Sequence, residues 1–235
     1  MRNRLWAVRQ EIEQLSKIQI VQGLSKVEQT SVFAAALYRR FPSTSVVTSQ
    51  GEPANHLFLL LKGSARYFFL TPDGRKTYLM WLTPGDIFGG ATLLVERSYF
   101  LVSTEIVKGS RALVWRRSAI RDLTIQYPRL LENSLNIAHN YLVWYVATHM
   151  SLICHSARER LGRTLIALAT GLGKKCGDGL QLDVTNEQLA NTANITEFSV
   201  SRFLNEWQRN GALTKCRGGI LLRAPDRLLQ HQYPR

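Results

Sequence analysis

The sequence predicts an α+β protein, in which an N-terminal antiparallel β-barrel of jelly-roll type is followed by a long helix and a C-terminal winged helix-turn-helix. Three observations predict this class. Short β-rich runs alternate with turn residues from about residue 56 to 117; no helix-breaking residue follows Pro128 for about 26 residues; and residues 185–207 read as two short helices joined by a tight turn. We therefore expect a barrel with preceding helices at 1–126, the long helix at 127–155 and the helix-turn-helix at 156–235.

Composition indicates a globular protein with an acidic partner. The 235 residues are 45% hydrophobic, which is ample for two packed cores, and the formal net charge is +13. Such a charge favours nucleic acid or an anionic membrane surface, but both halves of the chain are basic, so charge does not locate the binding surface. No apolar run is long enough to span a bilayer and no signal peptide is evident, so we expect a cytoplasmic protein with no membrane partner.

The barrel is predicted from regularly spaced strands. Residues 2–17 and 25–40 are expected to form helices that pack against it. The β-rich runs that follow lie at 56–62, 65–70, 76–82, 99–107 and 111–116. Turn sequences such as Thr71-Pro72-Asp73-Gly74 separate them, because Pro presets the first turn residue and Gly accepts a positive φ. This spacing is typical of a barrel or jelly roll.

The long helix carries two apolar faces. One contains Leu130, Ile137, Tyr141 and Trp144, and we expect it to cover the barrel. The other repeats at alternating steps of four and three residues, which is the spacing of a two-helix seam; its members are Leu131, Leu135, Ala138, Leu142, Tyr145, His149 and Leu152. We therefore expect a twofold homodimer in which this helix meets its own copy. The alternative is an ordinary buried helix in a monomer.

The segment from Thr185 to Trp207 is the most specific pattern in the chain. Thr185 followed by Gln188 predicts a capping-box start for the first helix, and Thr196 is expected to cap the second. Asn194 falls in the turn, where the backbone must tolerate left-handed geometry. The residues expected to be buried are Leu189, Ala190, Ala193, Ile195, Val200, Phe203 and Leu204.

The outward side of this segment carries residue types that bind DNA. Arg202 can bind guanine O6 and N7 bidentately, which is worth about 1–3 kcal/mol of base discrimination, and Glu197 or Phe198 can read cytosine or a thymine methyl. Residues 214–223 predict a Gly-turned hairpin, or wing, that contacts phosphates. The alternative for individual positions is a solvated helix face. The expected DNA-binding set is Thr185, Asn186, Thr196, Glu197, Phe198, Ser199, Ser201, Arg202, Asn205, Lys215 and Arg217.

In this order, the segments resemble the cyclic-AMP-receptor and fumarate-nitrate-regulator (Crp/Fnr) family of bacterial transcription factors. The resemblance covers nearly the whole chain and rests on GEPANHLFLLLKGSARYFFLTPDGRKTYLMWLTPGDIFGG, on YPRLLENSLNIAHNYL leading to ARERLGRTLIALA, and on NEQLANTANITEFSVSRFLNEWQRNGAL. It implies a homodimer that binds double-stranded DNA, an effector in the barrel beside the long helix, reorientation of the DNA-binding domains, and RNA polymerase as a partner if the protein is an activator.

The chain departs from the family where cyclic nucleotides bind. Nucleotide-binding members place Glu directly after the Gly that matches Gly89 and an Arg-Ser pair about ten residues later, whereas this chain has Gly90, Phe100 and Leu101 there. A phosphate would lose its countercharge, so we expect a small non-nucleotide effector. The expected pocket consists of Trp81, Phe88, Gly89, Gly90, Phe100, Leu101, Tyr141 and Tyr145. Two alternatives stay open: a cyclic nucleotide held by Arg97-Ser98, and a vestigial barrel in a regulator controlled by abundance or by a protein partner.

The recognition helix departs as well. The best-known members place Glu one residue before the Ser or Thr that matches Ser199, with Arg at the position of Arg202, and they read a TGA-type half-site. Here Phe198 occupies the Glu position. We expect a palindrome with half-sites about one helical turn apart, which keeps the guanine read by Arg202 and differs at its neighbour.

We expect no cofactor, metal site or catalytic residue. A cupin-type metalloenzyme needs clustered His and carboxylate ligands, but the barrel region contains only His56. Iron-sulfur members of the family use N-terminal cysteines, whereas the first cysteine here is Cys154. His149, Cys154 and His155 lie near one another in sequence, but adjacent helical residues point about 100° apart, so we expect no metal there.

Overall fold

The computed structural model describes residues 10–13, 15, 18–74, 76–94 and 98–229. The chain divides into two compact units, Met1–Trp144 and Tyr145–Arg235. The division falls inside the long helix α4 (Arg129–Cys154), which is continuous from one unit into the other. None of the described helices is both long and apolar enough to cross a membrane.

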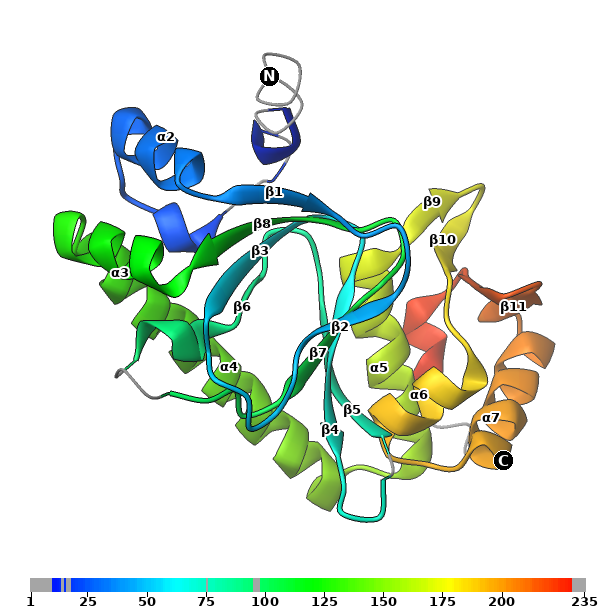
Figure 1. Cartoon of the computed structure of the whole chain (residues 1–235). Coiled ribbons are helices and arrows are strands. Elements are labelled where there is room, and N and C mark those ends of the chain that lie inside the picture. Colours follow the sequence, from blue (N-terminus) through cyan, green and yellow to red (C-terminus); the bar gives the residue numbers. More distant parts are fainter. Residues whose placement is uncertain (1–9, 14, 16–17, 75, 95–97, 230–235) are drawn as a thin grey trace. The chain divides into compact units, whose positions relative to one another are not determined.

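The first unit is built around two antiparallel four-stranded sheets (Figure 1). The first sheet has the order β1-β8-β3-β6, with bounds Leu37–Arg40, Arg111–Arg116, His56–Lys62 and Ile87–Phe88. The second has the order β2-β7-β4-β5, with bounds Ser45–Thr48, Ser103–Ile106, Ala65–Leu70 and Lys76–Leu82. Strands β3, β4, β5 and β8 coincide with four predicted runs, and β7 occupies part of the fifth. The predicted antiparallel barrel is therefore confirmed.

Strand β3 separates two hydrophobic cores. Phe58 and Leu60 point into a core between the sheets, together with Leu82 and Ile106. Leu57, Leu59 and Leu61 point the other way, because successive residues of a strand face opposite sides. There they pack with residues of helices α2 (Lys26–Ala34), α3 (Arg117–Gln126) and α4, and of the short helix η1 (Gln19–Val21). One strand thus joins the barrel interior to its helical cover.

The prediction of one helix over residues 25–40 was wrong at its end. Helix α2 starts with a capping box between Ser25 and Glu28 but stops at Ala34, and Leu37–Arg40 forms strand β1. Residues 37–40 pair in antiparallel register with residues 111–114 of β8, so the hydrogen bonds of the sheet outweigh local helix propensity. The helix predicted for residues 2–17 falls largely outside the described residues.

The second unit begins with the C-terminal part of α4. Only His155 and Ser156 separate α4 from α5 (Ala157–Leu172), which starts with a capping box between Ser156 and Glu159. Helices α6 (Asn186–Ala193) and α7 (Glu197–Arg209) follow, and β11 (Leu213–Cys216) and β12 (Gly219–Leu222) form a hairpin before the short helix η3 (Pro225–Leu228). The predicted winged helix-turn-helix is confirmed.

The wing belongs to a larger sheet than expected. Its order is β11-β12-β10-β9, and it includes a hairpin of β9 (Lys174–Cys176) and β10 (Gly179–Leu182) between α5 and α6. We did not predict this hairpin from the sequence. Its strands have three and four residues, which is too short for a periodic pattern to be recognised.

Candidate nucleic-acid interface and barrel pocket

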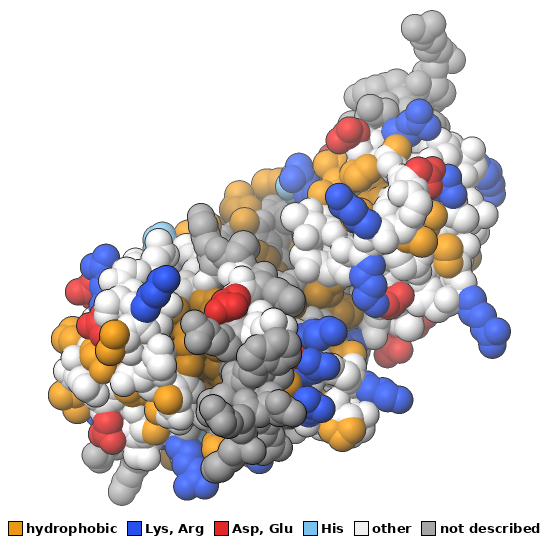
Figure 2. Space-filling view, turned by 90° about the horizontal axis from the view of Figure 1, so that it is seen from above, with side chains coloured by type: hydrophobic (Ala, Val, Ile, Leu, Met, Phe, Trp, Pro, Cys, Tyr) orange, Lys and Arg blue, Asp and Glu red, His pale blue; other side chains and the backbone are white. Residues whose placement is uncertain are grey.

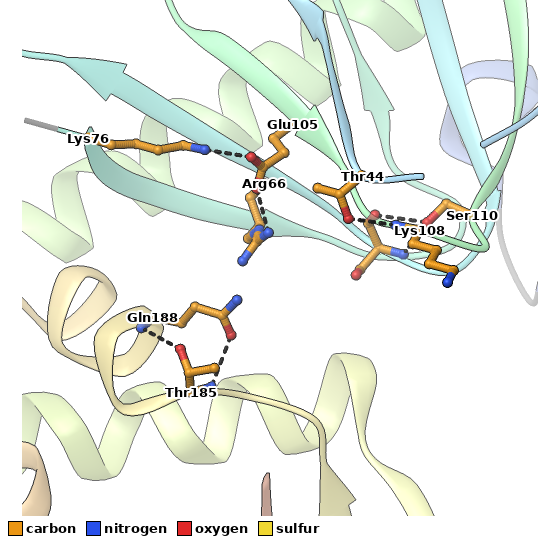
Figure 3. A network of polar contacts seen from close by, with 9 residues as sticks. Thr44, Arg66, Lys76, Glu105, Lys108, Ser110, Thr185 and Gln188 are labelled. Carbon is orange, nitrogen blue, oxygen red and sulfur yellow. Dashed lines mark hydrogen bonds and ion pairs between the residues drawn. The ribbon is translucent and has the colours of Figure 1, made fainter. Parts of the chain in front are cut away.

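The first helix of the candidate interface begins with the predicted capping box. Thr185 Oγ1 accepts a hydrogen bond from the Gln188 backbone N–H at 3.2 Å, and Gln188 Oε1 accepts one from the Thr185 N–H at 3.0 Å (Figure 3). Two N–H groups that a helix start leaves unpaired are thereby satisfied. The Thr185 hydroxyl therefore fixes the start of α6.

The turn between α6 and α7 has left-handed backbone geometry. Asn194 has φ +50° and ψ +58°, and it is the non-glycine residue with positive φ in the described part of the chain. Its N–H donates to the carbonyl of Ala190, and so does the N–H of Ile195 at 3.0 Å. Ile195 is half-buried rather than fully buried. The turn is tight because these contacts close it within two residues of the end of α6.

Helix α7 begins with the second predicted cap and buries one face. Thr196 Oγ1 accepts a hydrogen bond from the Ser199 N–H at 3.1 Å and lies 3.0 Å from Ser199 Oγ. The buried face consists of Val200, Phe203, Leu204 and Trp207. This stripe fixes which side of the helix is turned outward.

The outward face of α7 carries an aromatic ring and a cation one helical turn apart. Phe198 is 77% exposed, and Arg202, four residues later, is also exposed. Residues four apart share one side of a helix, so these two side chains are neighbours on that face. The Arg202 guanidinium lies 4.8 Å from the centre of the Phe203 ring. Glu197 and Asn205 are exposed, whereas Ser199 and Ser201 are half-buried.

The wing lies beside this helix. The Lys215 ammonium donates to Asn205 Oδ1, and the Lys215 N–H donates to Gln208 Oε1 at 3.3 Å. Arg217 is exposed at the hairpin turn. Thr185, Asn186 and Lys215 line one surface depression of about 230 Å³. The structure therefore brings residues of the α6 start and the wing together, beside the exposed face of α7.

Arg160, which contacts the turn between α6 and α7 from α5, was not identified from the sequence. Arg160 of α5 donates from Nε to the carbonyl of Ala193 at 3.0 Å and from Nη2 to that of Asn194 at 3.1 Å. Its Nη1 donates to the carbonyl of His155 at 2.9 Å. These partners lie up to 34 residues away along the chain, so no local pattern indicates the contacts. One guanidinium thus joins the end of α4 to the turn.

Basic side chains are not confined to this interface. Figure 2 shows Lys and Arg scattered over the visible face among hydrophobic and other residues. This agrees with the sequence, in which both halves are basic. Net charge therefore supports attraction to an anionic partner but does not identify the contact surface.

The seam residues of α4 share an exposed side of the helix. Leu135 is 65% exposed and Leu142 is 59% exposed, whereas Leu130 and Ile137 on the other side are buried. The remaining seam residues are also exposed; they are Leu131, Ala138, Tyr145, His149 and Leu152. Such an apolar surface is unusual for a helix that faces only water.

The residues expected to form an effector pocket are dispersed. Phe88 is buried, with its ring stacked on Phe58 at 4.7 Å, and Phe100 is 9% exposed. Leu101 is 85% exposed, while Gly90 and Tyr145 are also exposed and Trp81 is half-buried. Gly89 has φ +83°, and a Cβ there would lie 2.5 Å from the carbonyl oxygen of His56, so a side chain is excluded. Tyr141 is the member of this set that lines the described barrel pocket.

That pocket has a volume of about 170 Å³ and lies within the first unit. Its wall comes from η1, from the β5 and β6 region and from α4; the lining residues are Gln19, Met80, Gly85, Asp86, Ile87, Ile137, Asn140, Tyr141 and Trp144. The Tyr141 hydroxyl donates to the carbonyl of Ile87 and so joins α4 to the barrel. We did not predict Met80 or Asp86 as pocket residues, because the sequence shows them only as strand and turn positions.

Asp86 is held in place by the turn before it. Its Oδ2 accepts hydrogen bonds from the Thr83 N–H at 2.6 Å and from the Thr83 hydroxyl at 3.0 Å. Burial raises the pKa of Asp86 above its ordinary value, and the two bonds from Thr83 oppose that shift. Burial also raises the pKa of Tyr141 and of neighbouring Tyr67, and the negative charge of Asp86 adds to both effects. Asp86 and Tyr141 line the same pocket.

Arg66 of β4 and Lys76 of β5 are paired within the protein. Both donate to Glu105, as Figure 3 shows, with a distance of 2.5 Å from Lys76 Nζ to Glu105 Oε1. The Arg66 guanidinium also lies 4.8 Å from the Tyr78 ring centre and 5.1 Å from that of Trp81. Buried Arg66 and half-buried Lys76 therefore have partners within the protein and need no ligand. In the part of the chain that the structure describes, no group of three or more His, Cys, Asp or Glu side chains could hold a metal ion.

Two family models match the chain. A cyclic nucleotide-binding domain model matches residues 38–127, and a Crp-like helix-turn-helix domain model matches residues 159–231. The chain is 26% identical over 223 residues to the CRP-like cAMP-activated global transcriptional regulator of Mycobacterium tuberculosis, with 92% of this chain and 97% of the relative covered. It is 25% identical over 193 residues to the anaerobic regulatory protein of Bacillus subtilis, with 81% of each covered.

Solved structures agree in fold. The c-di-GMP responsive global regulator CLP of Xanthomonas campestris matches with a TM-score of 0.72 at 20% identity, covering 84% of this chain and 99% of that one. A transcriptional regulator of the CRP family from Thermus thermophilus matches with a TM-score of 0.70 at 24% identity, covering 81% and 96%. At these identities the likeness shows the fold alone.

Proposed function

The chain belongs to the Crp/Fnr family of DNA-binding transcription regulators, and from this premise we propose that it binds a palindromic operator as a homodimer. The observation that carries the proposal is the outward face of α7, where Phe198 and Arg202 stand exposed behind a capped, tight turn. A second helix held in this way enters the major groove in helix-turn-helix proteins. The relatives described above are a transcriptional regulator and a regulatory protein.

Within the interface we assign base reading to α7 and phosphate binding to its surroundings. The Arg202 guanidinium can bind guanine O6 and N7 bidentately, and Phe198 offers an apolar surface for a thymine methyl. Lys215 and Arg217 of the wing, and the helix starts at Thr185 and Thr196, suit phosphate oxygens. Because these are ionic contacts, affinity should fall steeply from low to physiological salt.

The proposed dimer is supported by the exposed seam of α4. Leu135 and Leu142 stand out on one side of a helix whose opposite side is buried. Pairing this side with its copy would remove apolar surface from water, and twofold symmetry would give half-sites about one helical turn apart. Sedimentation of the natural protein and of L135E/L142E tests this. The variant should be monomeric, and a variant that stayed dimeric would contradict the seam.

We propose that any effector is a small molecule other than a cyclic nucleotide. The Mycobacterium tuberculosis relative is described as cAMP-activated, but this chain places exposed Gly90 and Leu101 and buried Phe100 at the nucleotide-binding positions. Arg97-Ser98 is the alternative pair for holding a cyclic phosphate. Its Ser98 hydroxyl already donates to the Ala91 carbonyl and accepts a hydrogen bond from Arg117. Calorimetric titration with cyclic AMP should show no binding; saturable binding would overturn this assignment.

A regulator with a vestigial barrel is the second candidate. It is favoured by the pocket volume of about 170 Å³, which is below the usual range of roughly 300–1,000 Å³ for ligand sites. Thermal unfolding with and without a metabolite panel separates the two, because a ligand that binds only the folded state raises the midpoint. If the barrel is vestigial, the activity of the regulator would be controlled by its abundance or by a protein partner. In either case we propose a cytoplasmic location with the DNA, and contact with RNA polymerase if the protein activates transcription.

The direct test is selection of bound duplexes from a randomised pool, followed by sequencing. The expected result is an enriched palindrome with a guanine in each half-site. Enrichment of a single asymmetric site would contradict the dimer. If the pure protein enriches nothing, the selection is repeated with cell extract: enrichment then indicates a required effector, and its absence contradicts the DNA-reading assignment.

A further inference from the structure

The barrel pocket of the first unit combines one carboxylate with two aromatic rings, and we propose that it binds a small organic cation. This inference rests on the proposed function where it concerns regulation, because it names the ligand class of the sensor unit. The charge of the residues that line the pocket supports this ligand class. Among the described lining residues, Asp86 is the acidic one and there is no Lys, Arg or His.

The carboxylate has capacity for a further hydrogen bond. Among the described residues, Asp86 accepts hydrogen bonds from Thr83 alone, and both end on Oδ2. They leave Oδ1 to accept a donor from a ligand. An ammonium group supplies that donor together with the missing countercharge, and a charge-assisted bond of this kind is about twice as strong as a neutral one.

The rest of the wall suits the body of such a ligand. Tyr141 and Trp144 present aromatic rings, whose faces attract a cation, and Met80, Ile87 and Ile137 present apolar surface. The amides of Gln19 and Asn140 are the remaining polar side chains of the lining. The volume of about 170 Å³ restricts the occupant to a compact molecule.

The same wall discriminates against anions. A phosphate or carboxylate placed here would meet Asp86, and no cation stands among the described lining residues to neutralise it. Arg66 of β4 and Lys76 of β5 both donate to Glu105. The pocket therefore selects by sign of charge, and the selected sign is positive.

The position of the pocket gives its occupant access to two elements. Asp86 and Ile87 belong to the barrel, whereas Ile137, Tyr141 and Trp144 belong to α4. The Tyr141–Ile87 hydrogen bond already joins these elements on the pocket wall. A bound cation would contact both sides of that connection, so its binding is linked to the position of the helix that continues into the DNA-binding unit.

The test is calorimetric titration of the full-length protein with probes that differ in charge. Benzylammonium, phenethylammonium and choline are the cations, phenethyl alcohol is the neutral analogue of the second, and phenylacetate is the anion. We expect at least one cation to bind, phenethyl alcohol to bind about tenfold more weakly than its ammonium analogue, and phenylacetate not to bind. Failure of all three cations, or equal binding of alcohol and ammonium, overturns the proposal.

Variants assign the binding to this pocket. Asp86→Asn keeps the shape and the acceptor for Thr83 but removes the charge, so it should weaken cation binding about tenfold. Asp122→Asn is the matched control, because Asp122 is exposed on α3 outside the pocket. Trp144→Leu, which keeps the carboxylate, should weaken the cations and leave phenethyl alcohol nearly unchanged. Cation binding unaffected by both pocket variants would place the site elsewhere and contradict the proposal.

Operator binding is measured on the same samples by fluorescence anisotropy. A protein that binds the selected palindrome but none of the cations refutes the cation site and leaves the proposed function standing. A protein that binds cations through Asp86 but selects no DNA sequence, with or without them, refutes the proposed function alone.

Discussion

The phenol of Tyr141 donates a hydrogen bond to the backbone carbonyl of Ile87, and this contact joins the long helix to the barrel. The group is buried enough to raise the pKa of the phenol well above its ordinary value. Tyr141→Phe removes the donor and leaves the carbonyl without this partner. We expect a loss of about 1–2 kcal/mol in the free energy of unfolding, measured by urea denaturation. Tyr99→Phe, at a 52% exposed residue, is the control and should change little.

Arg202→Ala should relax base preference at one position of each half-site. Loss of a bidentate contact to guanine costs about 1–3 kcal/mol of discrimination there. Competition titrations with single-base variants of the selected operator measure it. Arg209→Ala, at an exposed residue at the end of α7, should leave the base preference unchanged. Equal weakening by Arg202→Ala on every duplex would show that Arg202 contacts phosphate only.

From the exposed ring of Phe198 we expect operator affinity to depend on a thymine methyl group. If its exposed ring packs on that methyl, replacing the contacted thymine by deoxyuracil removes one buried carbon and should cost about 0.8 kcal/mol. The measurement compares thymine and deoxyuracil operators with the natural protein and with Phe198→Ala. The variant should not distinguish the two duplexes. A natural protein equally indifferent to the methyl would leave Glu197 as the reader of this position.

From the left-handed backbone of Asn194 we expect its Ala and Gly variants to differ in stability. Its φ of +50° is unfavourable for residues with a Cβ, so Asn194→Ala should lose about 1–2 kcal/mol of stability, while Asn194→Gly should be close to neutral. Thermal unfolding measures both. Asn136→Ala, at an exposed position inside α4, is the control and should not destabilise. Equal loss in both Asn194 variants would instead assign the effect to its side chain.

Asp86 predicts a specific dependence of stability on pH. Burial raises its pKa above the ordinary 3.8, so the folded state holds the proton at pH values where the unfolded state has released it. The associated stability is present below 3.8 and is lost as pH rises through the raised value. Relative to Asp86→Asn, the natural protein should therefore lose stability on going from pH 3.5 upward, measured by urea denaturation at each pH. A constant difference between the two proteins would contradict the shift.

The sequence predicted those parts of the fold that depend on local patterns. Strands β3 and β8 follow from alternating or continuous apolar residues between turns, and the caps at Thr185 and Thr196 follow from residue types at fixed spacing. Leu37–Arg40 was assigned to a helix because its pairing with β8 is a contact between distant segments. Local propensity carries no information about such a partner.

The DNA-binding interface could be predicted from local sequence patterns, whereas the barrel pocket could not. The outward face of α7 could be predicted, because burial of Val200 and Leu204 fixes the orientation of Phe198 and Arg202. The barrel pocket could not, since Asp86 and Trp144 are separated along the chain and meet only through the packing of α4. The three hydrogen bonds of Arg160 could not be predicted either, because the fold and not a local sequence pattern brings their partners together.

The link between α4 and α5 consists of His155 and Ser156, and the carbonyl of His155 is already held by Arg160. A two-residue link has few rotatable bonds, so we expect α5 to explore few orientations about the end of α4. In the proposed dimer, the two recognition helices would then lose little conformational entropy when they align on an operator. Lengthening this joint with flexible residues should therefore weaken operator binding, because more conformational entropy would be lost on alignment.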